Sequence, residues 1–197
     1  LQTLAADEFP DLSAGELPHQ FEIEAHALKR LIDKTRFAIS TEETRYYLNG
    51  IYLHTAMKGQ EAMLRAVATD GHRLAQADQP RPEGAAGMPG IIVPRKTVHE
   101  LHRLTEEGAE TVRVGISQSK ARFEIGSITL TTKLIDGTFP DYGRVIPQAN
   151  DKSMRVGNAE FMSAVDRVST IASERGRAVK LAISGGKLVL SVNNPEG

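Results

Sequence analysis

Cysteine and tryptophan are both absent from this sequence, and aromatic residues make up only 5% of it. Without cysteine the chain has no disulfide framework, no cysteine-based zinc site and no thiol nucleophile. With so few aromatic side chains, the core has to be built from Leu, Ile, Val and Ala. The lack of cysteine suits a reducing compartment, and we expect a cytoplasmic protein.

An excess of positive charge is also missing. Lys and Arg number 24 against 25 Asp and Glu, which gives a formal net charge of −1. A compact domain that grips nucleic acid electrostatically is usually clearly basic. We therefore do not expect tight, general DNA binding. The balance leaves room for a protein that holds DNA loosely or by topology, with its basic residues on one face.

No stretch approaches the roughly 20 apolar residues of a membrane span, and the first residues lack the basic start and apolar run of a signal peptide. The chain begins without Met and ends with the segment Asn193–Gly197, which directly follows a strand-like run. We therefore expect both ends to be cut from a longer protein. The length of 197 residues suits one or two domains.

What the sequence does contain is a repeated module. Three segments each open with a short strand-like run, continue with a helix-period run and end in strand-period runs. The opening runs are Phe21–Ile23, Ile91–Val93 and Met154–Val156, and the helices are expected over residues 25–37, 95–104 and 158–172. Asn158 is the expected N-cap of the third helix.

Hydrophobic spacing predicts which side of each helix faces the core. The inward residues are expected to be Leu28, Leu31, Ile32, Val98, Leu101, Leu104, Phe161, Val165 and Val168. Strands are expected over residues 46–55, 64–68, 74–77, 111–116, 121–125, 127–133, 178–183 and 187–192. Gly126-Ser127 and Gly185-Gly186 predict tight hairpin turns.

A longer repeat groups the modules into blocks. Phe9-Pro10-Asp11 reappears as Phe139-Pro140-Asp141, about 130 residues later, which is a normal domain size. We expect the tail of one block over residues 1–17, a complete block over 18–148 and half of a third over 149–197. The complete block would hold modules at about 18–80 and 90–148, joined by a loop rich in Pro and Gly. The expected fold class is α+β, with helices on one face of antiparallel sheets.

Five stretches, in this order along the chain, resemble bacterial beta clamps, the family of the DNA polymerase III beta subunit. They are Arg45–Gly50, Ala68–Leu74, Ile92–Lys96, Lys133–Tyr142 and Asn193–Glu196. The resemblance covers essentially the whole chain. It implies the DNA clamp fold of repeated β-α-β-β(-β) units, with sheets outside and helices lining the hole of a homodimeric ring around duplex DNA.

The resemblance also implies a function. The ring would be a non-catalytic accessory subunit and processivity factor, working without a cofactor and without sequence preference. DNA polymerase subunits, the clamp loader and other proteins with clamp-binding motifs would dock through short peptides in one pocket per subunit. The matching pocket positions are Leu48, Thr69, Gly71, His72, Arg73, Leu74, Pro140, Arg144 and Val145.

The chemistry of these positions suits peptide docking. Apolar side chains can wall a site for Leu or Phe anchors, His72 and the two arginines can donate to peptide carbonyls, and Gly71 can take a positive φ. The plainer alternative is that Thr69–Gly71 is a turn and Leu74 belongs to the core. Gly176 stands where the best-known clamps carry an aromatic residue, so the resemblance does not extend to that side of the pocket.

The resemblance assigns DNA contact to Arg45, Tyr46, Tyr47, Arg95 and Lys96. Arg and Lys can pair with phosphates, and Tyr can hydrogen-bond to them or stack on an exposed base. The first helix also carries four basic residues, Lys29, Arg30, Lys34 and Arg36. The alternative for each of these charges is an ordinary solvated helix face.

A second hypothesis is a soluble metal-dependent hydrolase. Asp70, His72, His99 and His102 would supply its metal ligands. The sequence has no HExxH motif, no GxxxxGK[ST] phosphate loop and no GxGxxG motif to strengthen this hypothesis.

Overall fold

The computed structural model describes residues 15–106, 108–171 and 178–193. Phe9-Pro10-Asp11, most of the expected tail over residues 1–17, Gly176 and Asn194–Glu196 lie outside these residues. The chain divides into two compact units, Leu1–Asp141 and Tyr142–Gly197. Within the described residues, no helix is long and apolar enough to cross a membrane.

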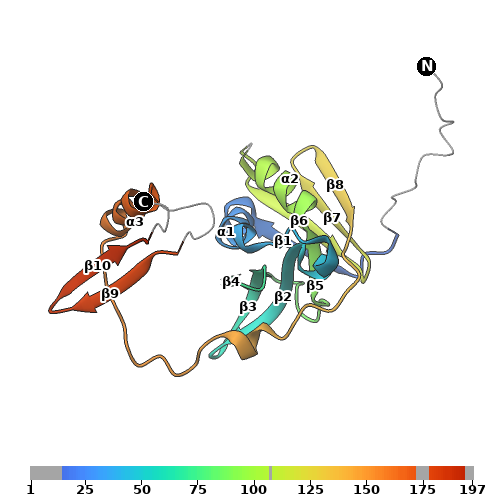
Figure 1. Ribbon diagram of the computed structural model, residues 1–197. Coiled ribbons are helices and arrows are strands. Elements are labelled where there is room, and N and C mark those ends of the chain that lie inside the picture. The colour runs from blue at the N-terminus through green and yellow to red at the C-terminus, as the bar shows by residue number, and fades with distance from the viewer. Residues whose placement is uncertain (1–14, 107, 172–177, 194–197) are drawn as a thin grey trace, which may run out of the picture. The chain divides into compact units, whose positions relative to one another are not determined.

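The first unit contains two modules with the same order of elements (Figure 1). The first module consists of β1 (His19–Glu24), α1 (Ala25–Thr35), η2 (Arg36–Ala38), η3 (Glu43–Leu48), β2 (Gly50–Lys58), β3 (Glu61–Thr69) and β4 (Leu74–Pro80). The second consists of β5 (Ile91–Pro94), α2 (Arg95–Glu106), β6 (Thr111–Ile116), β7 (Lys120–Ile125) and β8 (Ile128–Lys133). These elements match the predicted strands and helices, except at the start of β2.

The two modules exchange their opening strands. One four-stranded antiparallel sheet has the order β1-β6-β7-β8, and the other has the order β4-β3-β2-β5. In the first sheet Phe21 pairs with Val114, and in the second Ile51 pairs with Val93. Each module therefore completes the sheet of the other, and neither sheet is complete without both modules.

One hydrophobic core joins both sheets and both helices. Leu28, Leu31 and Ile32 of α1 are buried, as are Val98, Leu101 and Leu104 of α2, so the predicted inward faces are confirmed. The same core cluster includes Phe123 of β7 and Leu64 of β3. Figure 1 shows α1 and α2 side by side, and the two helices are in contact. The predicted α+β class with antiparallel sheets is confirmed.

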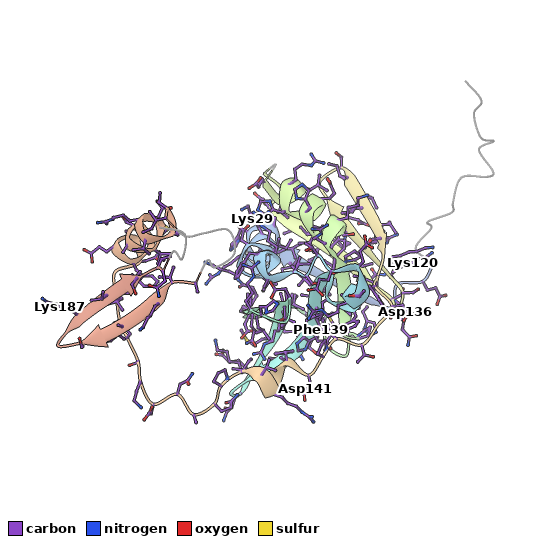
Figure 2. All side chains as sticks on the ribbon, viewed as in Figure 1. Lys29, Lys120, Asp136, Phe139, Asp141 and Lys187 are labelled. Carbon is purple, nitrogen blue, oxygen red and sulfur yellow. The ribbon has the colours of Figure 1, made fainter. Side chains whose placement is uncertain are left out.

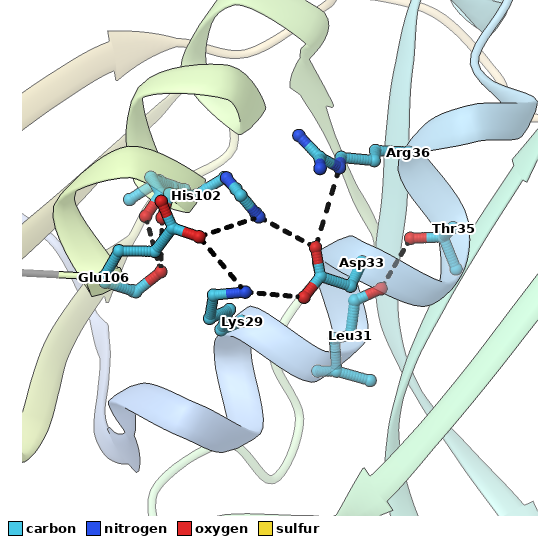
Figure 3. A network of polar contacts seen from close by, with 9 residues as sticks. Lys29, Leu31, Asp33, Thr35, Arg36, His102 and Glu106 are labelled. Carbon is cyan, nitrogen blue, oxygen red and sulfur yellow. Dashed lines mark hydrogen bonds and ion pairs between the residues drawn. The ribbon is translucent and has the colours of Figure 1, made fainter.

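A polar network also ties α1 to α2 (Figure 3). Asp33 Oδ1 lies 2.8 Å from His102 Nε2, and Lys29 Nζ donates to Asp33 Oδ2 at 2.8 Å. Lys29 also lies 3.4 Å from Glu106 Oε1. Burial raises the pKa of Asp33, but Lys29 and His102 outweigh it, so the pKa lies below its usual value. Lys29 and its partners thus support the packing of the two helices.

The structure corrects the expected start of β2. The sequence predicts strand over residues 46–48, yet they belong to the 3₁₀ turn η3, and the strand begins at Gly50. The amide of Asn49 donates to the carbonyl of Tyr46 at 3.0 Å, which closes the turn. A Cβ on Gly50 would collide with the carbonyl oxygen of Val93. The strand therefore starts where glycine permits β2 and β5 to approach each other.

The second unit contains η4 (Tyr142–Val145), α3 (Asn158–Ser169), β9 (Lys180–Ser184) and β10 (Lys187–Ser191). The last two strands form an antiparallel hairpin. Gly185 and Gly186 have φ values of +54° and +74°, which suits the predicted tight turn.

Two predictions for the second unit are wrong. Met154–Val156 is not a strand, and the N-cap of α3 is Gly157 rather than Asn158, with no side-chain capping bond. In the first unit an opening strand pairs only with the other module. Among its described residues the second unit has one module, so this segment has no such partner strand. Phe161, Val165 and Val168 are only partly buried for the same reason.

Because the modules share one core, we expect the first unit to unfold as a single cooperative transition. Replacing Leu31 with Ala should lower the free energy of unfolding by about 2–5 kcal/mol through the cavity it leaves. Amide hydrogen exchange should then accelerate in both sheets, including β6 and β7 of the other module. Exchange that accelerates only in the first module would contradict this, and the exposed Met57→Ala variant is the control.

Candidate functional site

The turn between β3 and β4 is held by side-chain bonds to its own backbone. Asp70 Oδ1 accepts hydrogen bonds from the amides of His72 at 3.0 Å and Arg73 at 2.9 Å. Thr69 Oγ1 accepts from the amide of Gly71 at 3.1 Å and donates to the carbonyl of Arg73 at 2.7 Å. Gly71 has a φ of +87°, which confirms the predicted positive φ. The turn has one defined shape, set by Thr69, Asp70 and Gly71.

This turn exposes two hydrogen-bond donors. His72 and Arg73 are both exposed, while Asp70 Oδ2 accepts from Arg73 Nε at 3.0 Å. The guanidinium carbon of Arg73 lies 5.7 Å from the centroid of the Phe37 ring. A cation this close to an aromatic face is attracted to it. Arg73 is thus held from two sides and keeps further N–H donors for a ligand.

Phe37 and Leu74 line one groove beside this turn. The Phe37 side chain is 54% exposed, and Leu74, the first residue of the edge strand β4, is half-buried. Both residues line the same depression, together with Arg30, Lys34 and Lys58. Phe37 is absent from the candidates predicted from sequence, because its position looks like the end of an amphipathic helix. Phe37 becomes a candidate for the site because its ring is exposed next to Arg73.

Arg45 lies between the two predicted sites. Its Nε donates to Glu42 Oε2 at 2.8 Å, and the pair raises the pKa of Arg45 and lowers that of Glu42. A Cβ on Gly71 would come close to the Arg45 guanidinium, so this side chain lies against the turn. The structure therefore places a residue predicted to contact DNA beside residues predicted for the partner pocket.

The remaining pocket candidates are spread more widely. Leu48 is only 4% exposed, so it does not form an open wall. Pro140 is exposed and follows the buried Phe139 in the first unit. Arg144 and Val145 are exposed residues of η4 in the second unit. The structure thus brings together the predicted residues of the β3–β4 turn, while the other candidates lie apart from it in the chain.

Residues predicted for DNA contact from two distant stretches line one depression. Tyr46, Arg95 and Lys96 lie around it with Asn49 and Ile135. They meet because the amide of Arg95 donates to the carbonyl of Asn49 at 2.9 Å. Tyr46 is 54% exposed, and its ring packs edge-to-face against Tyr47 at a centroid distance of 5.7 Å.

Two exposed cations outnumber the single carboxylate of Glu43 in the lining of this depression. Arg95 and Lys96 are exposed, and neither has an ion-pair partner among the described residues. They occupy the first turn of α2, where the helix dipole adds partial positive charge. The buried Asn49 Oδ1, which has no hydrogen-bond partner in the described part of the chain, is an acceptor and would bind a donor rather than an anion. Tyr46 adds a hydroxyl and an exposed ring at the margin.

The residues of the metal-site hypothesis are not gathered together. Asp70 is engaged by its own turn, and His102 by Asp33 on α1. Across residues 15–106, 108–171 and 178–193, no three His, Asp or Glu side chains are placed to share a metal ion. The geometry therefore gives no support to a metal-dependent hydrolase.

Two family models match the chain. The central domain of the DNA polymerase III beta subunit matches residues 22–141, and the C-terminal domain of the same subunit matches residues 143–197. A beta sliding clamp of Caulobacter vibrioides strain NA1000 is 56% identical over 196 residues, covering 100% of this chain and 53% of that protein. The beta sliding clamp of Escherichia coli K12 is 39% identical, with coverages of 100% and 52%.

Solved structures agree with these relatives. A sliding clamp from Bartonella birtlesii bound to griselimycin has 54% identity and a TM-score of 0.92, covering 100% of this chain and 53% of that one. The Caulobacter crescentus clamp with bound PEG has 56% identity and a TM-score of 0.92, with coverages of 98% and 52%. The predicted clamp fold is thereby confirmed. The chain spans about half the length of the curated relatives it matches.

The Asp70 turn has a testable pH dependence. Hydrogen bonds from Arg73 and His72 lower the pKa of Asp70 to about 2, below the value of about 3.9 for an unfolded Asp. The folded pKa is the lower one, so the carboxylate stabilises the turn above the unfolded pKa. This contribution should disappear as the pH falls from about 4 to about 2.

Nuclear magnetic resonance should record this as a midpoint near pH 2 for the Asp70 carboxyl group, with matching shifts of the His72 and Arg73 amides. The Asp70→Asn variant should lack the transition. A midpoint at the ordinary value for Asp would show that the turn does not depend on the carboxylate.

Proposed function

Since the chain belongs to the family of the DNA polymerase III beta subunit, we propose that it forms part of a DNA sliding clamp, a non-catalytic processivity factor. The single observation that carries this proposal is the position of the two candidate sites. A shaped turn for peptide docking and a cationic depression for DNA lie on the same unit, and Arg45 lies against that turn, next in sequence to Tyr46 of the depression.

A ring around DNA would require neighbouring blocks to join through the edge strands of their sheets. Each four-stranded sheet of the first unit has two edge strands with one partner each within the described chain, β1 and β8 in one sheet and β4 and β5 in the other. Such edges can pair with those of neighbouring blocks. A homodimeric ring built this way would hold duplex DNA by topology, and a net charge of −1 is compatible with that mechanism. The exposed Arg30 and Lys34 of α1 would add a weak, screened attraction to phosphates.

For the partner site we propose Thr69, Gly71, His72, Arg73, Leu74 and Pro140 of the first unit, together with the buried Leu48. Arg144 and Val145 of the second unit remain predictions that rest on the resemblance alone. We add Phe37 as an exposed aromatic neighbour of Arg73 and Leu74. Apolar side chains would receive the Leu and Phe anchors of a peptide, and the donors would fix its direction. The proposed partners are DNA polymerase subunits, the clamp loader and other proteins with a clamp-binding motif. The related clamp of Bartonella birtlesii has been solved with griselimycin bound.

The DNA site would be the depression of Tyr46, Arg95 and Lys96, with Tyr47 supporting Tyr46. Contacts to phosphates carry no sequence information, which suits a clamp that has to slide. Arg45 is engaged by Glu42, so we place it at the border of the two sites. Work on chromosomal DNA would take place in the bacterial cytoplasm.

For the arrangement of domains, we propose the tail of a first clamp domain over residues 1–17, a middle domain over 18–148 and half of a third over 149–197. The order in which the helices and strands repeat along the chain supports this proposal. The first unit repeats its elements within one block, and α3 with its hairpin follows the order of α1 with β2 and β3. The boundary between the two compact units, at Asp141 and Tyr142, lies in the segment that joins the middle block to the next one.

Removing the donor and the apolar side chain of the turn should abolish partner binding. We expect the double variant Arg73→Ala, Leu74→Ala to show no measurable affinity for a short peptide with Leu and Phe anchors, measured by fluorescence anisotropy. The Met57→Ala variant changes an exposed side chain on β2 and should bind normally. Unchanged affinity in a folded double variant would rule out the pocket.

Neutralising the depression should weaken DNA binding regardless of sequence. For the double variant Arg95→Ala, Lys96→Ala, we expect the slope of log affinity against log salt to fall by about 0.9 for each phosphate that the protein no longer neutralises. Anisotropy of a labelled duplex at low salt measures this slope. Arg113→Ala is the control, because Arg113 is already paired with Glu22 and Glu124. An equal decrease in both variants would contradict the assignment.

A further inference from the structure

The segment Leu134–Phe139, called the connector here, follows β8 and crosses to the other sheet of the first unit. The amide of Leu134 donates to the carbonyl of Ser119 at 2.9 Å, and that of Ile135 donates to the carbonyl of Ile92 on β5 at 3.0 Å. Its last residue, Phe139, is 8% exposed. In Figure 2, Phe139 lies among the side chains of the first unit, whereas Asp136 and Asp141 lie at its margin.

Phe139 is fixed by an aromatic stack. Its ring lies 4.9 Å from that of Tyr52 on β2, with an angle of 6° between the ring planes. Tyr52 in turn stacks on His54 at 4.6 Å and 24°. A buried ring stacked in this way is fixed in both position and orientation, and Tyr52 is itself held by His54. The anchor therefore determines where the connector ends.

This stack is separate from the hydrophobic core. On β2 the side chains alternate, so Ile51 and Leu53 enter the core while Tyr52 and His54 lie on the opposite face. Phe139 and Tyr52 are not members of the core cluster. The opposite face of this sheet has buried side chains of its own, since Val67 and Ile92, the register partners of Tyr52, are 0% and 3% exposed. Phe139 therefore belongs to this second face and not to the core that the two modules share.

Pro140, the next residue, depends on this anchor. It is exposed, and it has no amide hydrogen with which to bond to the sheet. The residue before a proline is restricted to extended conformations, and proline fixes its own φ, so the position of Phe139 is transmitted directly to Pro140. The hydrogen bonds at Leu134 and Ile135 lie on the far side of Gly137, the most flexible residue of the connector.

The connector also touches the loop of the proposed DNA site. A Cβ on Gly137 would lie 3.1 Å from Tyr47 Cβ and 3.5 Å from a ring carbon of Tyr46. The connector therefore passes closely over η3. The connector thus lies against Tyr46 of the proposed DNA site and leads directly into Pro140 of the proposed partner site.

We propose that Phe139 is a positioning residue for the partner-peptide site. By stacking on Tyr52, it holds Pro140 where it forms one wall of that site. This proposal rests on the proposed function. The role belongs to Phe139 alone, since Pro140 would be the residue that contacts the peptide.

The test compares Phe139→Ala with Phe139→Tyr in the full chain, using a short peptide with Leu and Phe anchors. We expect Phe139→Ala to weaken peptide binding by about 10-fold or more, because the wall is no longer preorganised. Phe139→Tyr retains the stack and should bind within about 2-fold of the unsubstituted chain. Tyr52→Leu, which removes the other ring of the stack, should weaken binding as Phe139→Ala does.

A core variant separates positioning from stability. Phe123→Ala in β7 makes the same change at a more deeply buried core site of the same unit, away from the stack. We expect it to lower the melting temperature at least as much as Phe139→Ala while leaving peptide affinity unchanged. Equally weakened binding in both variants would overturn the proposal, because a general destabilisation would then explain the effect.

The results separate the positioning role of Phe139 from the proposed partner site itself. If the unsubstituted chain binds the peptide and Phe139→Ala binds it equally well, the positioning role is wrong and the proposed function stands. If the unsubstituted chain binds no such peptide, the proposed partner site is wrong and the positioning role fails with it.

Discussion

The exchange of opening strands between two modules governs the architecture of the first unit. β1 pairs with β6, and β5 pairs with β2, so the backbone groups of each opening strand are satisfied only by the other module. The exchange also brings α1 and α2 together over a single core. It explains why Met154–Val156, which lacks a second module among the described residues, does not form a strand although its sequence resembles the other openings.

One of the two candidate sites, the depression at Tyr46, is a direct consequence of this arrangement. Pairing of β5 with β2 brings Arg95 to the carbonyl of Asn49, and with it the cationic turn of α2 to Tyr46. The β3–β4 turn carries its own rigidity, because Thr69 and Asp70 satisfy its amides. A binding surface built on a rigid turn gives up little conformational entropy when a ligand docks. The chemistry of both sites is recognition, which agrees with the family to which the chain belongs.

Besides the strand exchange and the β3–β4 turn, the connector fixes part of the first unit without belonging to its core. It crosses from one sheet to the other and ends in the stack of Phe139 on Tyr52. For the proposed partner site to keep its shape, the chain that leaves the first unit has to be held firmly at Phe139. An aromatic stack serves this purpose better than hydrogen bonds to solvent-exposed backbone, since water does not compete for it.

Periodicity, glycine positions and short motifs are local properties, and they were enough to predict the modules, the inward faces of α1 and α2, the hairpin turns and the family. They also identified Gly71 and the turn from Thr69 to Leu74. The exchange of the opening strands, the turn at residues 46–48 and the place of Arg45 against Gly71 became visible only in three dimensions. The same holds for Phe37 and Phe139, whose roles arise from neighbours far away in the chain. Local pattern fixes which face of an element is apolar, whereas the partner of that face is chosen by packing over long sequence distances.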